Sequence, residues 1–274
     1  MKLYSTADGL VVAQDRQLRL LPPAFSLDQL FSAAEPSRLL REQLAAARDV
    51  AQLGRLLAPL QSQEVWAAGV TYFRSRTARM AESKTAGGGS FYDRVYEAER
   101  PELFFKATPH RVAAPGMAVR IRSDSRWNVP EPELTLAINA HGRIFGHTIG
   151  NDMSSRDIEG ENPLYLPQAK VYDGSAALGP CLVVSPDLPS ADTVIAIEIL
   201  RGGAKVFADQ TTVGQIKRPL PSLADWLYRE NRFPHGCYLM TGTGIVPPDY
   251  FTLQHGDEIR ITIGTVGTLA NPVG

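Results

Sequence analysis

One stretch, WNVPEPELTLAINAHGRIFGHTIGNDMSSRD, from Trp127 to Asp157, constrains the fold more than any other part of the chain. On both sides of His141-Gly142, apolar residues alternate with polar or small ones, and an alternation of period two is typical of strands with one apolar face. A two-residue turn is the shortest connection of a β-hairpin. We therefore predict two antiparallel strands, ELTLAINA and RIFGHTIGND, joined by His141-Gly142.

The predicted hairpin brings three acidic side chains together. Counting back from the turn places Glu131 opposite Asp152 and Glu133 opposite Gly150. Residues two apart on a strand lie about 7 Å apart, and directly opposed Cβ atoms lie about 5 Å apart. Three carboxylates would then crowd one end of one face. The other face would carry Leu134, Leu136, Ile138, Phe145, His147 and Ile149.

Three crowded carboxylates need positive charge nearby. A lysine or an arginine would serve, but converging carboxylates are also the oxygen ligands of a hard divalent cation. Pro130 and Pro132 favour a metal, because they stiffen the backbone that carries Glu131. The alternative is a solvated acidic strand end, in which the prolines protect a sheet edge. We predict that Glu131, Glu133 and Asp152 bind Mg²⁺, with Mn²⁺ and Ca²⁺ as the other candidate ions.

The composition excludes several classes of protein. The 274 residues include 28 basic and 29 acidic side chains, so no strong field attracts nucleic acid or an anionic membrane. Cys181 and Cys237 are the only cysteines and form no CxxC pair, which favours two reduced cysteines in a core. The sequence starts without a secretion pattern, and no apolar run is long enough to span a membrane. We predict a cytoplasmic protein that binds neither nucleic acid nor a membrane.

Turn signals and hydrophobic periodicity divide the chain into two predicted domains. Residues 1–60 form a small N-terminal α+β domain, with a hairpin that turns at Asp8-Gly9 and a helix from Pro36 to Leu57. Residues 61–274 are rich in strand patterns and contain one clear late helix, SLADWLYREN, capped by Ser222. The predicted fold class is therefore a β-rich α+β protein.

A basic segment between Thr71 and Tyr96 leads into three consecutive glycines, at positions 87–89. Three glycines cost backbone entropy and are typical of a hinge. We interpret the segment as a lid that closes over a substrate; the alternative is a plain flexible loop. Its arginines Arg74, Arg76 and Arg79 either hold the substrate or form one solvated helix face.

Several short segments, in consistent order from about Val65 to Gly274, carry a family resemblance. They are GVTY (69–72), PEPEL (130–134), NDMSSRD (151–157), AKVYDG (169–174), TGTG (241–244) and the terminal GDEIRITIGTVGTLANPV. Together they resemble the fumarylacetoacetate hydrolase family. The resemblance implies a mixed β-roll catalytic domain, a magnesium-type site, and substrates that chelate the metal through a 2-oxo acid or a β-diketone. It also implies a homodimer or a homotetramer.

Carried over position by position, the resemblance gives roles to individual residues. It again makes Glu131, Glu133 and Asp152 the metal ligands, and it makes Lys170 the active-site lysine. Arg156 and the TGTG turn fall near the substrate. The predicted substrate-binding residues are Tyr72, Arg74, Ser75, Arg76, Arg156 and Gly242.

One departure separates this chain from the C–C hydrolases of the family, in which the loop after GxxY supplies a histidine that activates water. This chain has YFRSRTARMAES there, and its five histidines lie elsewhere. The arginine-rich loop, the PEPEL segment and FYDRVYEAERPELFFKA instead resemble the 2-keto-3-deoxy sugar acid dehydratase branch. In that branch, residues that match Glu102, Lys170 and Thr243 surround the substrate. These three are therefore the predicted catalytic residues.

The predicted reaction is the magnesium-dependent loss of water from a 2-keto-3-deoxy sugar acid, with a pentonate favoured, to give a 2,5-dioxo acid such as 2,5-dioxopentanoate. The C1 carboxylate and C2 carbonyl would chelate the metal, and Lys170 or Glu102 would remove a C3 proton to form a chelated enolate. A Schiff base on Lys170 is an alternative mechanism. In a simpler interpretation, Lys170 only neutralises the acidic cluster and Glu102 is a salt-bridged strand end.

Two other functions stay open. One is a hydrolase or decarboxylase that acts on a 2,4-dioxo acid of the fumarylpyruvate or acylpyruvate type. The other is a metal-stabilised binding or structural module without turnover. A lysine, a glutamate and a threonine beside the carboxylates exceed what a structural cation needs, which favours an enzyme with a small 2-oxo acid substrate.

Overall fold

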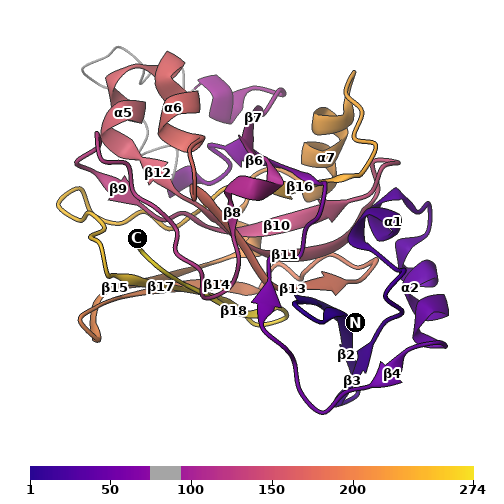
Figure 1. Ribbon diagram of the computed structural model, residues 1–274. Coiled ribbons are helices and arrows are strands. Elements are labelled where there is room, and N and C mark those ends of the chain that lie inside the picture. The colour runs from indigo at the N-terminus through magenta and orange to yellow at the C-terminus, as the bar shows by residue number, and fades with distance from the viewer. Residues whose placement is uncertain (75–93) are drawn as a thin grey trace.

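The protein is described by a computed structural model that covers residues 1–74 and 94–274 (Figure 1). Its main sheet has twelve strands: β1 (Lys2–Thr6), β2 (Gly9–Gln14), β3 (Gln17–Leu20), β4 (Arg48–Asp49), β5 (Leu56–Leu57), β6 (Glu64–Gly69), β7 (Glu102–Ala107), β8 (Val112–Ala113), β10 (Pro132–Ile138), β11 (Ile144–Asp152), β13 (Ala176–Val184) and β16 (Cys237–Met240). The sheet is mixed, because β8 runs parallel to β13 and β6 runs parallel to β16. The hairpin strands β10 and β11 lie in its middle, flanked by β16 and β13.

A second, smaller sheet covers one face of this hairpin. It contains β14 (Val194–Arg201), β15 (Ala204–Thr212), β17 (Glu258–Ile263) and β18 (Gly267–Pro272) in the order β15-β14-β17-β18. Two short strands, β9 (Asn128–Val129) and β12 (Ser154–Ser155), pair separately. The two layers confirm the predicted β-rich α+β class.

The helices are short and lie at the margins of the sheets (Figure 1). Those whose bounds lie within the described residues are α1 (Leu27–Ser32), α2 (Pro36–Leu44), α5 (Arg156–Glu161), α6 (Leu166–Lys170) and α7 (Leu220–Tyr228), with 3-10 turns at Pro109–Arg111, Pro163–Tyr165 and Val213–Gln215. In Figure 1, α5 and α6 lie together at the upper left, next to β12. No helix in the described ranges is both long and apolar enough to cross a membrane.

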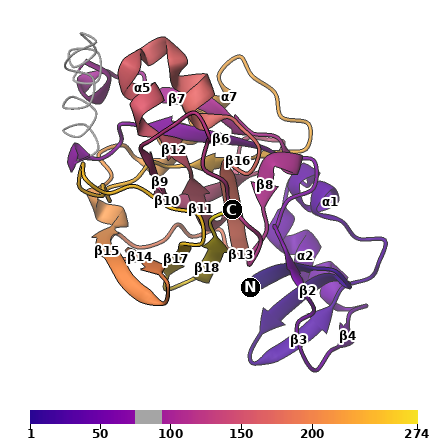
Figure 2. The same ribbon diagram turned by 60° about the vertical axis from the view of Figure 1, so that its left-hand side comes forward.

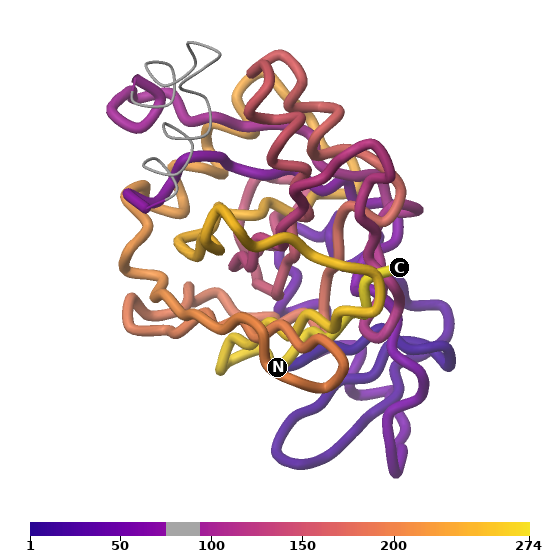
Figure 3. Tube along the Cα trace, turned by 90° about the vertical axis from the view of Figure 1, so that its left-hand side faces the viewer, coloured from indigo at the N-terminus to yellow at the C-terminus, as the bar shows by residue number. Residues whose placement is uncertain are grey.

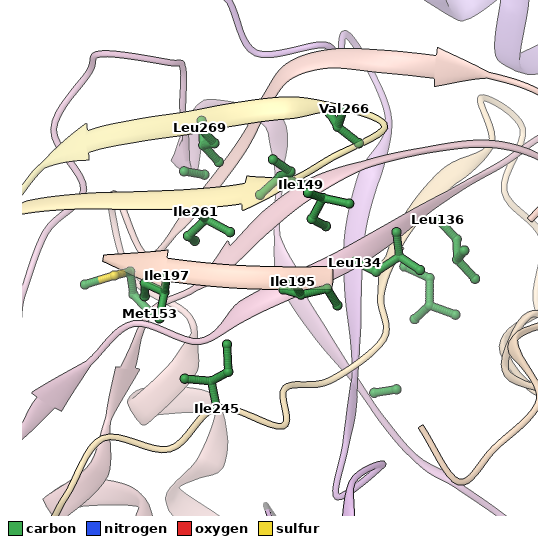
Figure 4. Packing of buried hydrophobic residues seen from close by; sticks show 14 of the residues in the cluster. Leu134, Leu136, Ile149, Met153, Ile195, Ile197, Ile245, Ile261, Val266 and Leu269 are labelled. Atoms are coloured by element: carbon green, nitrogen blue, oxygen red, sulfur yellow. The ribbon is translucent and has the colours of Figure 1, made fainter. Parts of the chain in front are cut away.

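Apolar side chains fill both faces of the central hairpin, so all seven residues of β10 are buried. Between the two sheets, Leu134 and Ile149 pack with Ile195 and Ile261 of the second sheet (Figure 4). Fully burying one such side chain contributes roughly 1.5–3 kcal/mol. The hairpin therefore lies within a packed core, which supports its acidic end.

The register of the hairpin is confirmed at its acidic end, but the predicted turn is wrong. Glu133 lies opposite Gly150, and Glu131 exchanges backbone hydrogen bonds with Asp152. The connection is longer than the predicted two residues, since the backbone N–H of Asn139 donates to the carbonyl of Arg143. A bulge restores the register further along: Ala137 faces Gly146 and Ile138 faces Ile144, which leaves Phe145 as the extra residue.

This bulge also corrects the face that was predicted for Phe145. Leu134, Leu136, Ile138 and Ile149 form one core cluster, whereas Phe145 belongs to the other. Its ring meets that of Phe31 edge to face, with centroids 4.8 Å apart. The longer turn shifts the pairing by one residue up to the bulge, so Phe145 lies on the face opposite to the predicted one, which alternation alone does not reveal.

The N-terminal segment extends the main sheet through the pairing of β1 with β13. Figures 2 and 3 show it as an indigo lobe at one end of the molecule. The predicted hairpin is present, although Thr6 pairs with Gly9 and the turn is therefore Ala7-Asp8. The predicted helix from Pro36 to Leu57 is too long: α2 ends at Leu44, and the residues after it include β4, which pairs with β3, and β5, which pairs with β1.

Two smaller predictions concern the later part of the chain. The helix predicted from Ser222 begins two residues earlier, at Leu220, and Pro219 rather than Ser222 precedes its first turn. It ends at Tyr228 because Arg229 is extended. Cys181 and Cys237 are both free and buried, as predicted. The division into domains at residue 60 stays a prediction.

Candidate active site

Three carboxylates meet at the end of the central hairpin. Glu131 immediately precedes β10, Glu133 is its second residue, and Asp152 is the last residue of β11. One oxygen from each lies within 4.8 Å of the others, and no more than 4% of any of the three residues is exposed. Among residues 1–74 and 94–274, this is the only group of three or more acidic, histidine or cysteine side chains so arranged.

Cationic side chains surround the carboxylates, as the crowding of charge predicted. The Lys170 ammonium donates to Glu131 Oε2 at 2.8 Å and to Asp152 Oδ2 at 3.2 Å. Arg156 Nη2 donates to Glu131 Oε1 at 2.9 Å. A third cation, Lys106, has its Nζ 2.6 Å from Asp152 Oδ1. Two of the three buried carboxylates, those of Glu131 and Asp152, thus share three buried cationic partners.

Burial destabilises the charged forms of these side chains, and this effect shifts the pKa values of Glu133 and Lys106. Burial raises the pKa of Glu133 well above its ordinary value, and the neighbouring charges of Asp152 and Glu131 raise it further. Opposing this, the backbone N–H of Gly242 donates to Glu133 Oε2 at 2.6 Å. Burial lowers the pKa of Lys106, against the attraction of Asp152. More positive charge beside Glu133 would therefore stabilise its ionised form.

The donor set fits a hard divalent cation. A small cavity of about 20 Å³ opens on the carboxylates, which is room for roughly one ion or one water. Its lining residues are Ala68, Gly69, Val70, Phe104, Glu131, Glu133, Asp152, Arg156, Lys170, Gly242 and Thr243. They include carboxylate oxygens but no imidazole or thiolate, and such a set suits Mg²⁺, Mn²⁺ or Ca²⁺.

The predicted catalytic residues lie at or beside this cavity. Lys170, the last residue of α6, and Thr243 both line it. The Thr243 hydroxyl accepts from the backbone N–H of Ile245 at 3.1 Å. Glu102 begins β7 opposite Gly69, and its carboxylate lies so close that an added Cβ at Gly69 would be 2.0 Å from Oε2. Gly69 lines the cavity, so Glu102 borders the site.

The predicted substrate-binding residues divide into two groups. Arg156 and Gly242 line the cavity, and Tyr72 is buried, with a pKa raised by burial and by the nearby Glu133. Arg74 is largely exposed and donates to Asp209 Oδ2 at 2.7 Å, so it does not line the cavity. Its role stays a prediction. Ser75, Arg76, Arg79 and the three glycines of the proposed lid lie outside the described residues.

Lys106 is the site residue that the sequence reasoning missed. It is fully buried on β7, within the segment ELFFKA. A lysine enclosed in an apolar strand is rare unless it is paired, and Lys106 follows Glu102 by four positions, which places both on one side of the strand. These two signals together could have identified it.

Comparison with known proteins finds similar sequences and structures. The sequence profile described as "Fumarylacetoacetate (FAA) hydrolase C-terminal" matches residues 65–274. A Haloferax volcanii protein named "Probable 2-keto-3-deoxyxylonate dehydratase" is 46% identical over 216 residues, which are 78% of this chain and 73% of that protein. The "2-dehydro-3-deoxy-D-arabinonate dehydratase" of Saccharolobus solfataricus is 41% identical over 222 residues, 80% of this chain and 74% of the relative.

One solved structure extends the similarity to the whole chain. It is described as "2-keto-3-deoxy-D-arabinonate dehydratase complexed with magnesium and 2,5-dioxopentanoate". The TM-score is 0.85 at 32% sequence identity, and the match covers 100% of this chain and 98% of the other. The similarity therefore includes the N-terminal segment as well as the part that carries the site.

Proposed function

This chain belongs to the fumarylacetoacetate hydrolase family, and we propose that it is a magnesium-dependent dehydratase that converts a 2-keto-3-deoxy pentonate to 2,5-dioxopentanoate. The observation that carries the proposal is the buried set of Glu131, Glu133 and Asp152 with the Lys170 ammonium bonded between two of them. Two relatives above 40% identity carry dehydratase names, and a similar structure contains magnesium and the dioxo product.

The three carboxylates would hold the cation at the floor of the cavity. When bound, magnesium polarises the C2 carbonyl of a 2-oxo acid and makes its C3 protons more acidic. Glu131 and Asp152 are fixed by their paired backbones, and Glu133 is fixed by the Gly242 N–H. This rigidity matters because a metal site gains affinity when its ligands need no rearrangement.

The chemistry needs one group that takes a proton from C3 and one that gives a proton to the C4 hydroxyl. Lys170, beside the carboxylates, is placed for the first role, and Glu102, beside Gly69, is placed for the second. Breaking the C3–H and C4–O bonds releases one water and forms a C3=C4 double bond. Moving a proton from C5 to C3 then gives a C4=C5 enol, and moving the proton of its C5 hydroxyl to C4 gives the C5 aldehyde of 2,5-dioxopentanoate, so atoms and charge balance.

Two further residues would orient the substrate. Arg156 lies in the cavity wall with one nitrogen on Glu131, and its planar guanidinium suits a carboxylate or hydroxyl of the sugar acid. Thr243 presents a hydroxyl from the opposite segment of the wall.

The names arabinonate and xylonate in the two relatives do not imply different chemistry. A 2-keto-3-deoxy pentonate has lost the stereocentres at C2 and C3, and only C4 remains chiral. Within the D series or within the L series, the two names therefore describe one compound. We propose that the substrate of this chain is a pentonate of one C4 configuration. We also propose that the chain works as a cytoplasmic homodimer or homotetramer.

The test is incubation of the purified chain with Mg²⁺ and a panel of 2-keto-3-deoxy pentonates and hexonates, with products followed by mass. The proposal predicts loss of the mass of one water from a pentonate. Carbon–carbon cleavage fragments from a 2,4-dioxo acid, without dehydration of any member of the panel, would instead identify the hydrolase or decarboxylase alternative. No histidine lines the described cavity, which disfavours that outcome.

A further inference from the structure

Lys106 is a buried cation that none of the steps above uses. Its Nζ lies 2.6 Å from Asp152 Oδ1, and it donates to the backbone carbonyls of Met153 at 2.9 Å and of Lys170 at 2.5 Å. An ammonium has three hydrogens and no lone pair to accept with. Two of the hydrogens are donated to these carbonyls, and the ammonium forms an ion pair with the Asp152 carboxylate. All three oxygens belong to the segments that carry the site.

The contacts among Lys106, Asp152 and Lys170 form a closed ring, and this ring includes one proposed metal ligand, Asp152. Asp152 meets Lys106 through Oδ1 and Lys170 through Oδ2, and the Lys170 carbonyl returns to Lys106. Met153 follows Asp152 directly, so Lys106 holds both the side chain of Asp152 and the backbone behind it. It also holds the last residue of α6, whose side chain enters the cavity.

The two lysines differ in where they lie. Lys170 lines the cavity, whereas Lys106 does not, although both are fully buried. Burying a charge is costly, and an apolar residue of similar volume often serves stability equally well or better. Packing alone therefore does not explain a lysine at position 106. Its contacts with Asp152, Met153 and Lys170 suggest that it holds these site residues in place.

We propose that Lys106 is a positioning residue, which sets Asp152 and Lys170 at the separation that metal binding and C3 proton transfer require. The inference rests on the proposed function of the same site. Lys106 does not line the cavity and acts through Asp152 and the Lys170 backbone. Losing it displaces the base from C3 while leaving Glu131, Glu133 and the substrate contacts of Arg156 in place.

The test compares the full-length chain with Lys106→Met, which matches lysine in length without its charge. At saturating Mg²⁺ and substrate, kcat should fall by about a hundredfold, the cost of a small misplacement of reacting groups. KM for the pentonate should change little. Lys205→Met is the matched control, because it removes a lysine that pairs with the exposed Glu198, and its kcat should equal that of the unmodified protein.

Two results would overturn the proposal. If Lys106→Met keeps full kcat and only melts at a lower temperature, the lysine serves stability alone. If instead KM rises and kcat is unchanged, it binds substrate directly. If the variant does not fold, a crystal structure of the unmodified chain with Mg²⁺ tests the proposal instead. The proposal predicts that Lys106 Nζ keeps its contacts with Asp152, Met153 and Lys170. An Nζ that leaves these contacts and points toward the bound ion would contradict the proposal.

The same structure separates this inference from the proposed function. If the unmodified chain dehydrates no pentonate, the proposed function fails, while the three contacts in the Mg²⁺-bound structure still report on the positioning role. If dehydration occurs and the contacts are lost, only the positioning role fails.

Discussion

Glu131 and Asp152 exchange two backbone hydrogen bonds, from the Glu131 N–H to the Asp152 carbonyl at 3.2 Å and from the Asp152 N–H to the Glu131 carbonyl at 3.0 Å. The side chains of two residues so paired leave the sheet on the same face. The separation of these two carboxylates is therefore set by the ladder of the central sheet, and the acidic cluster is part of the fold itself.

Replacing Glu131 by glutamine keeps its shape and removes one ligand charge. In the unmodified chain, Mg²⁺ should raise the melting temperature, because a ligand at a hundred times its Kd stabilises the folded state by about 2.7 kcal/mol. Glu131→Gln should lose most of this shift and at least about a hundredfold in dehydration rate. Glu258→Gln, at an exposed ion pair with Arg260, is the control. A full Mg²⁺ shift in Glu131→Gln would contradict the ligand assignment.

Gly69→Ala tests the role of Glu102 without altering any carboxylate. The new Cβ would lie 2.0 Å from Glu102 Oε2, so the side chain of Glu102 must move away. Because a positioned acid contributes about 10²–10⁴-fold to rate, we expect kcat to fall at least about tenfold while the Mg²⁺-induced melting shift stays. Gly264→Ala is the matched control, since its Cβ meets nothing within 4 Å. An active Gly69→Ala enzyme would remove Glu102 from the mechanism.

Lys170 is predicted to act as a base and not as a nucleophile. Its Nζ is bonded to Glu131 and Asp152, which a divalent cation would also bind. Treatment with borohydride in the presence of substrate should therefore leave the mass of the chain unchanged and its activity intact. A stable adduct mapped to Lys170 would establish a Schiff base instead. Lys170→Met, which cannot take up a proton, should be inactive by either route.

His147 gives the stability of the fold a specific dependence on pH. It is buried on β11, with Nε2 3.1 Å from Thr265 Oγ1, and burial, aided by the positive N-terminus, lowers its pKa from 6.5 to about 4. Between pH 6.5 and about 4, the His147 imidazole is therefore protonated in the unfolded chain but neutral in the folded chain. The stability present above pH 6.5 should fall by about 3 kcal/mol as the pH decreases to 4.

Denaturant titrations at pH 7 and pH 4 measure this contribution. His147→Gln should lose less stability between the two values than the unmodified chain, because the carboxylates that also titrate there are common to both. His255→Gln, at an exposed position, should behave like the unmodified chain. Equal losses in all three proteins would contradict the assignment to His147.

The acidic site could be predicted because alternation along ELTLAINA and RIFGHTIGND fixes which residues share a face. The prediction nevertheless succeeded through two compensating features, since a longer turn shifts the register and the bulge at Phe145 restores it. Neither feature is encoded in the two-residue periodicity. With only the longer turn or only the bulge, the register would have been shifted by one residue, and the predicted pairing of Glu131 with Asp152 would have been wrong.

Long-range pairing could not be predicted in the same way. β1 pairs with β13 across most of the chain, and neither strand contains a signal that selects the other. The contacts of Lys106 have the same character, because Asp152, Met153 and Lys170 are brought to it by three separate segments. Local patterns predict strands and turns, whereas such partners depend on the packed fold.

The most direct test of the central claim is to follow one 2-keto-3-deoxy pentonate with the purified chain and with Glu131→Gln, each with Mg²⁺ and with a chelator. Product is identified by NMR and by mass. The proposed mechanism predicts 2,5-dioxopentanoate from the unmodified chain with Mg²⁺, and almost none in the other three reactions. Equal turnover by Glu131→Gln or with the chelator present, or a product that has lost carbon, would contradict it.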